Sequence, residues 1–529
     1  MLFVLFAIFA PHTFADWQYL SRPDLSPPRL NITVPAHSSV APGYLFLAQY
    51  LGFQEGSVGP EQPGAYIFRD DGDLVWSGFG YLAGWVADFG PTTINGSSVL
   101  RAFQGLLDSP HGRMHGDHSV LNQDYETVKI LRAASHRLVS CHEFQVVDGG
   151  RSVLIETPVS IPMDLSAYGG DEDQKWIVSN GFQELDIETG ELFFEWYSAE
   201  NVTPNRSAFP LESDGAFNAR SSLDAWNYFH INSVDKDDQG NYLVSARNFA
   251  AIFKINGTSG QVLWQLGGIG SDFDVPENAK FAYQHDARFR FRSNDGTIER
   301  ISLFDNADHS APGRSINPFS RARYIELDHT TETVREVHNY RPPDDLVTHS
   351  QGNVQFVPGG NVFVNWGQAG AVTEYSRDGQ VLFHAYLDSH PNKYVQSYRG
   401  FRSPWTGHSS EEPAVLALAD LVGQRSNYVS IYVSWNGNTE TEVWQFYAAG
   451  EKAKERSLGM AKRTGFETSF EIDLGLALVE DWSDISVIAE ALDSKGNVLG
   501  RNQAPYASRK NCQGQSCVDF GAVPERLEL

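Results

Sequence analysis

Short runs of alternating apolar and polar residues, each broken by a turn of Asp, Asn or Gly, recur along much of the chain. At 65–76, Ala-Tyr-Ile-Phe is followed by the turn Arg-Asp-Asp-Gly-Asp and then by Leu-Val-Trp. Alternation puts every second side chain on one face of a strand, and Asp-Gly suits a tight turn, so the pattern predicts a β-hairpin. The same pattern returns at 118–131, 182–196, 251–266, 322–340 and 372–386.

These hairpins are spaced by roughly 50–70 residues, and helical periodicity is scarce between them. Radial repetition of antiparallel sheets is how a β-propeller limits its exposed strand edges. The sequence therefore predicts an all-β protein with a six-bladed β-propeller over residues 42–407. Beyond it, further alternating strands predict a small β-sandwich, Ig- or fibronectin-like, at 408–505, before a polar tail at 506–529. The Pro- and Ser-rich segment 16–41 is expected to be an extended N-terminal arm.

A histidine opens the segment before four of the hairpins, where the inner strand of a blade is expected. These histidines are His142, His230, His285 and His349. Equivalent positions on successive inner strands face one level of the central channel, so the four side chains are predicted to converge there. They could hydrogen-bond water in a wet channel, hold zinc or copper, or take part in catalysis. Zinc-motif spacing is absent and carboxylates are sparse nearby, so we expect no metal and no other cofactor.

The N-terminus predicts export. Residues 2–10 are apolar, and Thr13 and Ala15 supply the small residues that precede a cleavage site before Asp16, so 1–15 is predicted to be a signal peptide. Five Asn-x-Ser/Thr sequons also predict a secreted glycoprotein; they lie at Asn31, Asn95, Asn201, Asn205 and Asn256. Cys512 and Cys517 flank a short polar loop and are predicted to form a disulfide, whereas Cys141 is expected to be buried.

The net charge and the hydropathy of the chain limit the classes of partner that it can bind. The net charge of −26 argues against nucleic acid, which selects basic surfaces. After the leader, no apolar stretch reaches the length of a membrane span. A small molecule is the expected partner, and the sequence carries no signal for the oligomeric state.

Motifs spread over about 45–407 carry a family resemblance. They are His-Ile-Asn-Ser-Val-Asp at 230–235, Leu-Trp-Gln-Leu-Gly-Gly at 263–268, Gln-His-Asp-Ala-Arg-Phe at 284–289, Leu-Phe-Asp-Asn at 303–306, Ser-Gln-Gly-Asn-Val-Gln at 350–355 and Tyr-Arg-Gly-Phe-Arg-Ser-Pro-Trp-Thr-Gly at 398–407. In combination they resemble the fungal branch of the arylsulfotransferase (ASST) family. The resemblance implies a six-bladed propeller that transfers sulfate from a phenol ester to another phenol through a sulfohistidine, independently of the nucleotide donor PAPS.

The resemblance also assigns residues. It makes His349 the histidine that forms the sulfohistidine and His230 and His285 its catalytic partners. Because acidic Asp286 follows it, His285 is expected to stay protonated as a donor or acid. The family's arginine closely follows Asp-Asn-Gly, whereas here Asp305-Asn306 is followed by Ala. The expected substrate-binding residues are His142, Asn232, Asn306, Asn353 and either Arg314 or Arg321.

Imidazole is a competent nucleophile toward a sulfuryl group, whose oxygens histidine, asparagine and arginine can bind. No serine elbow, P-loop or dinucleotide motif competes for the assignment. Two alternatives remain: an acid–base enzyme of secondary metabolism acting on an aromatic natural product, and a non-catalytic binding propeller. An arginine among the histidines favours sulfotransfer, its absence favours the acid–base enzyme, and a channel plugged by side chains favours the binding protein.

Overall fold

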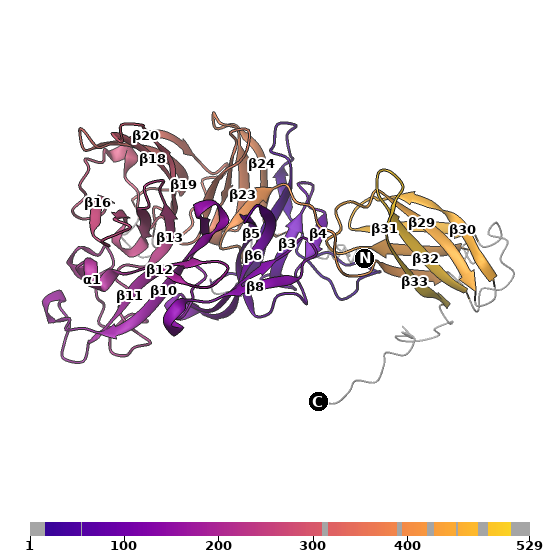
Figure 1. Cartoon of the computed structure of the whole chain (residues 1–529), viewed down its shortest axis with the longest axis horizontal. Helices are drawn as coiled ribbons and strands as arrows, with labels where there is room; N and C mark the ends of the chain where they lie inside the picture. Colours follow the sequence, from indigo (N-terminus) through magenta and orange to yellow (C-terminus); the bar gives the residue numbers. More distant parts are fainter. Residues whose placement is uncertain are drawn as a thin grey trace, which may run out of the picture. The chain divides into compact units, whose positions relative to one another are not determined.

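The computed structural model describes residues 16–53, 56–308, 316–388, 394–419, 428–450, 453–473 and 485–508. The predicted leader, Arg314 and the predicted Cys512–Cys517 pair lie outside these ranges. The described chain is all-β and forms two compact units (Figure 1). One unit contains Ser26–Trp405 with the segment up to Trp17, and the other contains Gln18–Leu25 and the chain from Thr406 onward.

Six antiparallel sheets of four or five strands make up the first unit, within the described ranges. The first two contain β2 (Tyr44–Leu51), β3 (Gly64–Phe68), β4 (Leu74–Ser77), β25 (Val395–Gln396) and β26 (Gly400–Ser403), then β5 (Trp85–Ile94), β6 (Ser97–Asp108), β7 (Arg113–Leu121) and β8 (Thr127–Leu131). The next two contain β9 (Phe144–Val147), β10 (Ser152–Pro162), β11 (Trp176–Asp186) and β12 (Leu192–Tyr197), then β13 (Ile231–Lys236), β14 (Tyr242–Ala246), β15 (Ala251–Ile255) and β16 (Val262–Gly267). The last two contain β17 (His285–Arg292), β18 (Ile298–Asp305), β19 (Arg321–Asp328) and β20 (Thr333–Tyr340), then β21 (Asn353–Phe356), β22 (Val362–Asn365), β23 (Ala371–Tyr375), β24 (Val381–Tyr386) and β1 (Asn31–Val34). Single helical turns, such as α1 (Ser198–Asn201), lie in the connections.

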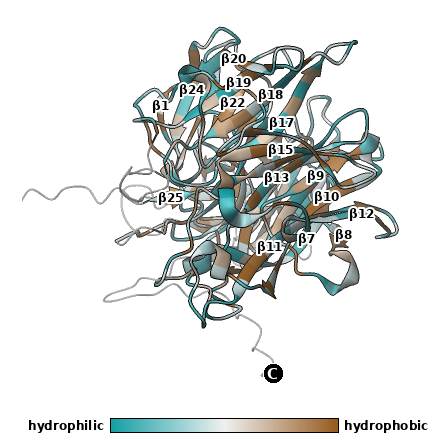
Figure 2. Ribbon diagram, turned by 90° about the vertical axis from the view of Figure 1, so that its left-hand side faces the viewer, coloured by the Kyte–Doolittle hydropathy of each residue, from teal (hydrophilic) through white to brown (hydrophobic). Residues whose placement is uncertain are grey.

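The six predicted hairpins are confirmed. Each is an antiparallel pair within one of the six sheets: β3–β4, β7–β8, β11–β12, β15–β16, β19–β20 and β23–β24. Repeated four-stranded sheets of this kind are typical of a β-propeller. Hydrophobic colour lies mainly along the strands in Figure 2, and the connections are mostly hydrophilic.

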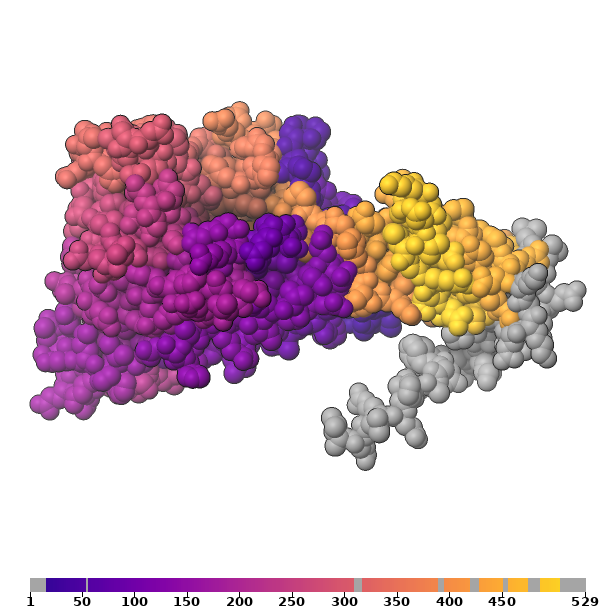
Figure 3. Space-filling view, viewed as in Figure 1, coloured from indigo at the N-terminus to yellow at the C-terminus, as the bar shows by residue number. Residues whose placement is uncertain are grey.

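Both ends of the first unit pair with a sheet formed by the opposite end. β26 pairs with β2 through Tyr44 and Ser403, and β1 pairs with β24 through Asn31 and Tyr386. The indigo first sheet and the orange β23 and β24 accordingly lie side by side in Figures 1 and 3. These pairings cover strand edges that would otherwise be open. Part of the expected N-terminal arm is thus a strand of the last sheet.

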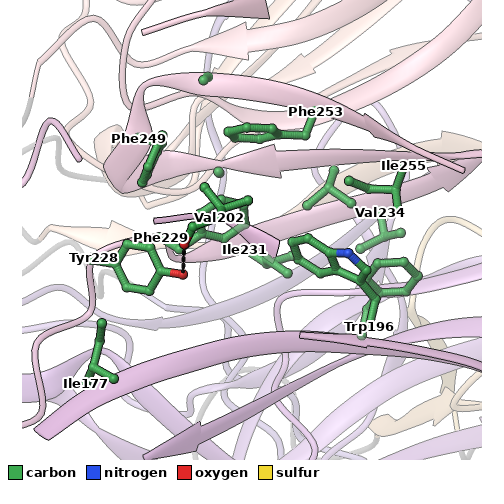
Figure 4. Close-up of a cluster of buried hydrophobic side chains, with 14 of the residues drawn as sticks. Ile177, Trp196, Val202, Tyr228, Phe229, Ile231, Val234, Phe249, Phe253 and Ile255 are labelled. Atoms are coloured by element: carbon green, nitrogen blue, oxygen red, sulfur yellow. Dashed lines mark hydrogen bonds between the residues drawn. The ribbon is translucent and has the colours of Figure 1, made fainter. Parts of the chain in front are cut away.

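Apolar side chains fill the space between neighbouring sheets. In the largest cluster, β15 contributes Ala251, Phe253 and Ile255, every second residue of the strand, against β11, β12 and β13 (Figure 4). The Tyr228 hydroxyl, inside the cluster, donates to the Val202 carbonyl at 3.0 Å, so burying the phenol leaves no donor unpaired. Each fully buried side chain of the size of Ile or Phe stabilises the fold by about 1.5–3 kcal/mol.

The second unit is a seven-stranded sheet with its own core. In spatial order it contains β30 (Ala453–Lys462), β29 (Val443–Gly450), β32 (Ile485–Leu492), β33 (Val498–Ser508), β27 (Ala414–Ala419), β28 (Tyr428–Ser434) and β31 (Glu467–Asp473). Trp435, Trp444 and Phe446 are central to the core. The segment 18–25 belongs to this unit, where the Ser21 amide and hydroxyl both donate to Glu467 at 2.6 Å. None of the described helices is long and apolar enough to cross a bilayer.

Candidate active site

The four predicted histidines, which come from different sheets, line one cavity of about 270 Å³. His142 and His230 lie just before β9 and β13, His285 begins β17, and His349 precedes β21. Each therefore stands at the entry to the first strand of its sheet. This equivalence, repeated from sheet to sheet, explains why residues so far apart in sequence meet.

Aromatic side chains form much of the remaining wall. Tyr50, Phe53, Phe209, Phe217 and Tyr398 all face the cavity. Pockets for drug-sized ligands are roughly 300–1,000 Å³. This smaller cavity with aromatic walls suits a substrate built on a single aromatic ring.

His349 is paired with a carboxylate. Its Nδ1 lies 3.2 Å from Asp308 Oδ1, within ion-pair distance but outside hydrogen-bond geometry, which leaves Nε2 for a substrate. The His349 side chain is 33 % exposed, against 8 % for His142. His111, which sequence reasoning missed, also lines the cavity and has Asp108 at Nδ1, but its Nε2 contacts Asp224 and its side chain is 11 % exposed. His349 is thus the most accessible of the three cavity histidines that have a carboxylate at Nδ1.

His142 is also paired with a carboxylate. Its Nδ1 lies 3.1 Å from Glu156 Oε2 and 2.6 Å from Ser140 Oγ, and Glu156 is buried in β10. The His142 ring packs edge-on against His230, with ring centroids 4.9 Å apart. As with His349, the arrangement leaves Nε2 as the nitrogen available for proton transfer.

His230 is set up as a hydrogen-bond donor. Asn227 Nδ2 donates to His230 Nδ1 at 2.8 Å, so neutral His230 carries its proton on Nε2. Its φ of +58° lies in the left-handed region, which costs free energy for a residue other than glycine. The bond from its amide to Asn180 Oδ1, 2.9 Å long, helps to hold this conformation.

His285 uses both ring nitrogens inside the protein. Nδ1 donates to Asn306 Oδ1 at 2.7 Å, and Nε2 accepts from the Gln351 amide at 3.1 Å. Burial, followed by the nearby charge of Arg247, lowers the pKa of His285 well below its usual value. The expectation that His285 stays protonated is therefore wrong. Asp286 does not serve it, because its carboxylate binds Arg288 at 2.8 Å and accepts the Val354 amide at 2.9 Å.

Arg247, at the end of β14, is the arginine of the cavity, and sequence reasoning missed it. Its Nη1 donates to Asn248 Oδ1 at 2.9 Å and its Nη2 donates to the His349 carbonyl at 2.8 Å. Among the described residues it forms no ion pair with a carboxylate. Burial lowers its pKa to about 10, which still leaves it protonated at neutral pH. A guanidinium without a carboxylate partner gives this cavity a positive charge that suits an anion.

The other predicted binding residues support the cavity from outside. Arg321 is 3.4 Å from Asp305 and does not line the cavity. Asn306 holds His285 and also donates to the Thr348 and Gln351 carbonyls, at 3.1 Å each. Asn232 and Asn353 donate to the Gln284 and Gly400 carbonyls, at 2.6 and 3.0 Å. Asn306 and Asn232 thus hold the backbone next to His349 and His285.

A buried ionic cluster adjoins the cavity. It consists of Arg101, Arg288, Arg399, Asp88, Glu143 and Asp286. Arg399 links it to the site by donating to the His142 carbonyl at 2.8 Å. Although burial opposes ionisation, Arg288 and Arg399 lower the pKa of Glu143 to about 2. Side chains therefore fill the space beside the cavity without filling the cavity itself. Nowhere in the described ranges are three His, Cys, Asp or Glu side chains arranged to hold a metal ion.

Comparison with known proteins gives one family match and several distant structural likenesses. The family model for Arylsulfotransferase (ASST) matches residues 90–387, more than half of the chain. No curated protein matches in sequence. Similar solved structures include a protein of unknown function from Bacteroides caccae, which is 12 % identical with a TM-score of 0.38 over 69 % of this chain and 100 % of that one. Another is virginiamycin B lyase from Staphylococcus aureus, which is 9 % identical with a TM-score of 0.28 over 65 % and 80 % of the two chains. Likenesses this distant carry no functional argument.

Proposed function

We propose that this chain, which belongs to the arylsulfotransferase (ASST) family, transfers a sulfuryl group between phenols in the histidine-lined cavity, through a sulfohistidine and without PAPS or another cofactor. One observation carries the proposal. An accessible imidazole with a carboxylate at Nδ1 adjoins an arginine that has no carboxylate partner among the described residues, in a small aromatic cavity.

In the first half-reaction, His349 Nε2 attacks the sulfur of an aryl sulfate. The N–S bond forms as the ester S–O bond breaks, and the phenolate leaves with the bonding electron pair. Asp308, 3.2 Å from Nδ1, stabilises the positive charge that develops on the ring. Arg247 and the Nε2–H of His230 are the donors for the peripheral sulfuryl oxygens.

In the second half-reaction, an acceptor phenol attacks the sulfohistidine. His142, backed by Glu156, takes the proton of the phenol hydroxyl while the phenol oxygen bonds to sulfur and the N–S bond breaks. Electrons and protons balance, because His349 returns to its neutral form and the proton on His142 is available to the next leaving phenolate. Poorly acidic phenols need this base most.

The rest of the proposal concerns architecture and location. The six sheets are the six blades of a β-propeller, and the second unit is a β-sandwich. The chain is secreted, with the leader removed, glycans on the five sequons and a Cys512–Cys517 disulfide. In support, Asn95 and Asn205 are exposed on the first unit, as glycan acceptors must be.

The test is incubation of the secreted protein with 4-nitrophenyl sulfate and phenol, with intact-mass detection of a sulfuryl adduct. His349→Ala is expected to abolish both adduct and turnover. The matched control His37→Ala, at an exposed histidine, is expected to retain both. Adduct formation by His349→Ala would assign the nucleophile to another histidine.

A second candidate is an acid–base enzyme acting on an aromatic natural product. The carboxylate-paired histidines His349 and His142 in one cavity favour it, since one can act as an acid and the other as a base. It becomes the leading candidate if the wild type forms no adduct with any aryl sulfate.

A further inference from the structure

A second cavity, of about 350 Å³, lies between the β5–β8 sheet and the β9–β12 sheet. It shares no lining residue with the histidine cavity. Its polar lining is basic, with Arg113, His115, His136 and Arg137, and includes no carboxylate. A basic hollow stands out on a chain whose net charge is −26.

Arg113 forms no ion pair with a carboxylate in the described part of the chain and has an unsatisfied N–H group. Its Nη1 donates to the Ser222 carbonyl at 3.1 Å, and its Nη2 has no hydrogen-bond partner among the described residues. Asp108 and Asp224 are near enough to act on it electrostatically, yet both bind His111 instead, at 2.8 and 3.1 Å. A buried N–H without a partner costs free energy that a ligand acceptor would recover.

The other basic residues of the cavity complete the set. Arg137 lies over the Tyr197 ring, 5.6 Å from its centroid, and has no ion-pair partner in the described part of the chain. His115 follows Arg113 on the same face of β7, two residues along. Burial and the charge of Arg113 lower the pKa of His115, so it is neutral and offers a hydrogen bond rather than a charge.

The opposite lining is apolar and open to solvent. Leu138 and Leu223 are each 53 % exposed, and Pro158, Val159 and Val178 lie beside them in the cavity. An inorganic anion would leave these leucines in water. A ligand with an apolar body would cover them.

We propose that this second cavity binds a small organic anion whose sulfate or carboxylate head contacts Arg113 and Arg137 and whose apolar body covers Leu138 and Leu223. Two guanidinium groups present the planar pairs of N–H donors that such heads accept. Binding of a nucleic acid requires many more phosphate contacts than two arginines can make, and the apolar wall forms no favourable contact with a polyanion. The site is independent of the sulfotransfer proposed above.

The test counts binding sites by isothermal titration calorimetry with benzenesulfonate, which has a single aromatic ring. Its C–S bond cannot donate a sulfuryl group to histidine. Wild type is expected to bind two molecules per chain, and the Arg113→Gln/Arg137→Gln double variant is expected to bind one. Each lost arginine should weaken the second site by roughly tenfold or more, the usual loss for a charge-assisted hydrogen bond. Arg151→Gln, at an exposed arginine outside both cavities, is the control and should keep both sites.

Further measurements keep the outcomes distinct. Leu223→Glu should also abolish binding at the second site. Because Leu223 lies on an exposed loop, this substitution should leave folding intact. Inorganic sulfate should bind there at least tenfold more weakly, and equal affinity would overturn the apolar part of the proposal. A double variant that still binds two molecules would overturn the site itself. The double variant should transfer sulfate at the same rate as the wild type. If the wild type shows no sulfotransfer, that result bears only on the proposed function and not on the second cavity.

Discussion

Glu156→Gln separates the two half-reactions. The substitution keeps the shape of the side chain and removes the negative charge 3.1 Å from His142 Nδ1. At that distance a unit charge pair is worth about 5 kcal/mol at an effective dielectric constant of about 20. If the amide dipole of glutamine retains about half of this, the protonated imidazole loses roughly 2–3 kcal/mol, or about 10²-fold in rate. We expect this loss only where a proton must be taken from the acceptor.

Stopped-flow release of 4-nitrophenol measures the first half-reaction, because that acidic leaving group needs no proton. The burst should persist in Glu156→Gln while steady-state turnover with phenol falls by about 10²-fold. Acidic acceptors, such as halogenated phenols, should recover most of the rate. Glu188→Gln, whose side chain is 79 % exposed, is the control. A uniform loss across all acceptors, or a lost burst, would refute a base role for His142.

Three further predictions address the anion site, the pH dependence and the core. Arg247→Gln should lower turnover by about 10²–10³-fold without preventing slow adduct formation, and intact-mass time courses measure both. Burial lowers the pKa of His118 to about 3, so between pH 7 and 5 the unfolded chain takes up a proton that the folded chain does not. This residue should therefore lower the free energy of unfolding by roughly 2 kcal/mol when the pH falls from 7 to 5. Urea midpoints measure this loss, which should be smaller in His118→Asn than in the wild type. Phe229→Ala, in the largest core cluster, should cost about 3–5 kcal/mol in urea unfolding, whereas Phe193→Ala, at a 39 % exposed position, should cost little.

Much of the fold was readable from local sequence. The turn and the flanking alternation at 65–76 or 251–266 lie within one short segment, so the hairpins β3–β4 and β15–β16 follow from neighbouring residues alone. The meeting of the four histidines was also predictable, because each occupies the same position in a repeated unit. The pairing of β1 with β24 was not, since the partner strand lies at the far end of the first unit's sequence.

The chemistry of each histidine was decided by tertiary structure. Asp286 follows His285 in sequence, yet it binds Arg288, while Asn306 and Gln351 occupy both nitrogens of the His285 ring. Arg247 belongs to the site because the fold brings it next to His349, whose carbonyl accepts its hydrogen bond although the two residues lie in segments of different sheets. Sequence alone thus determined that the four histidines meet, because repetition and alternation are local. Protonation state and role depend on burial and on partners brought in from other sheets, and these exist only once the chain has folded.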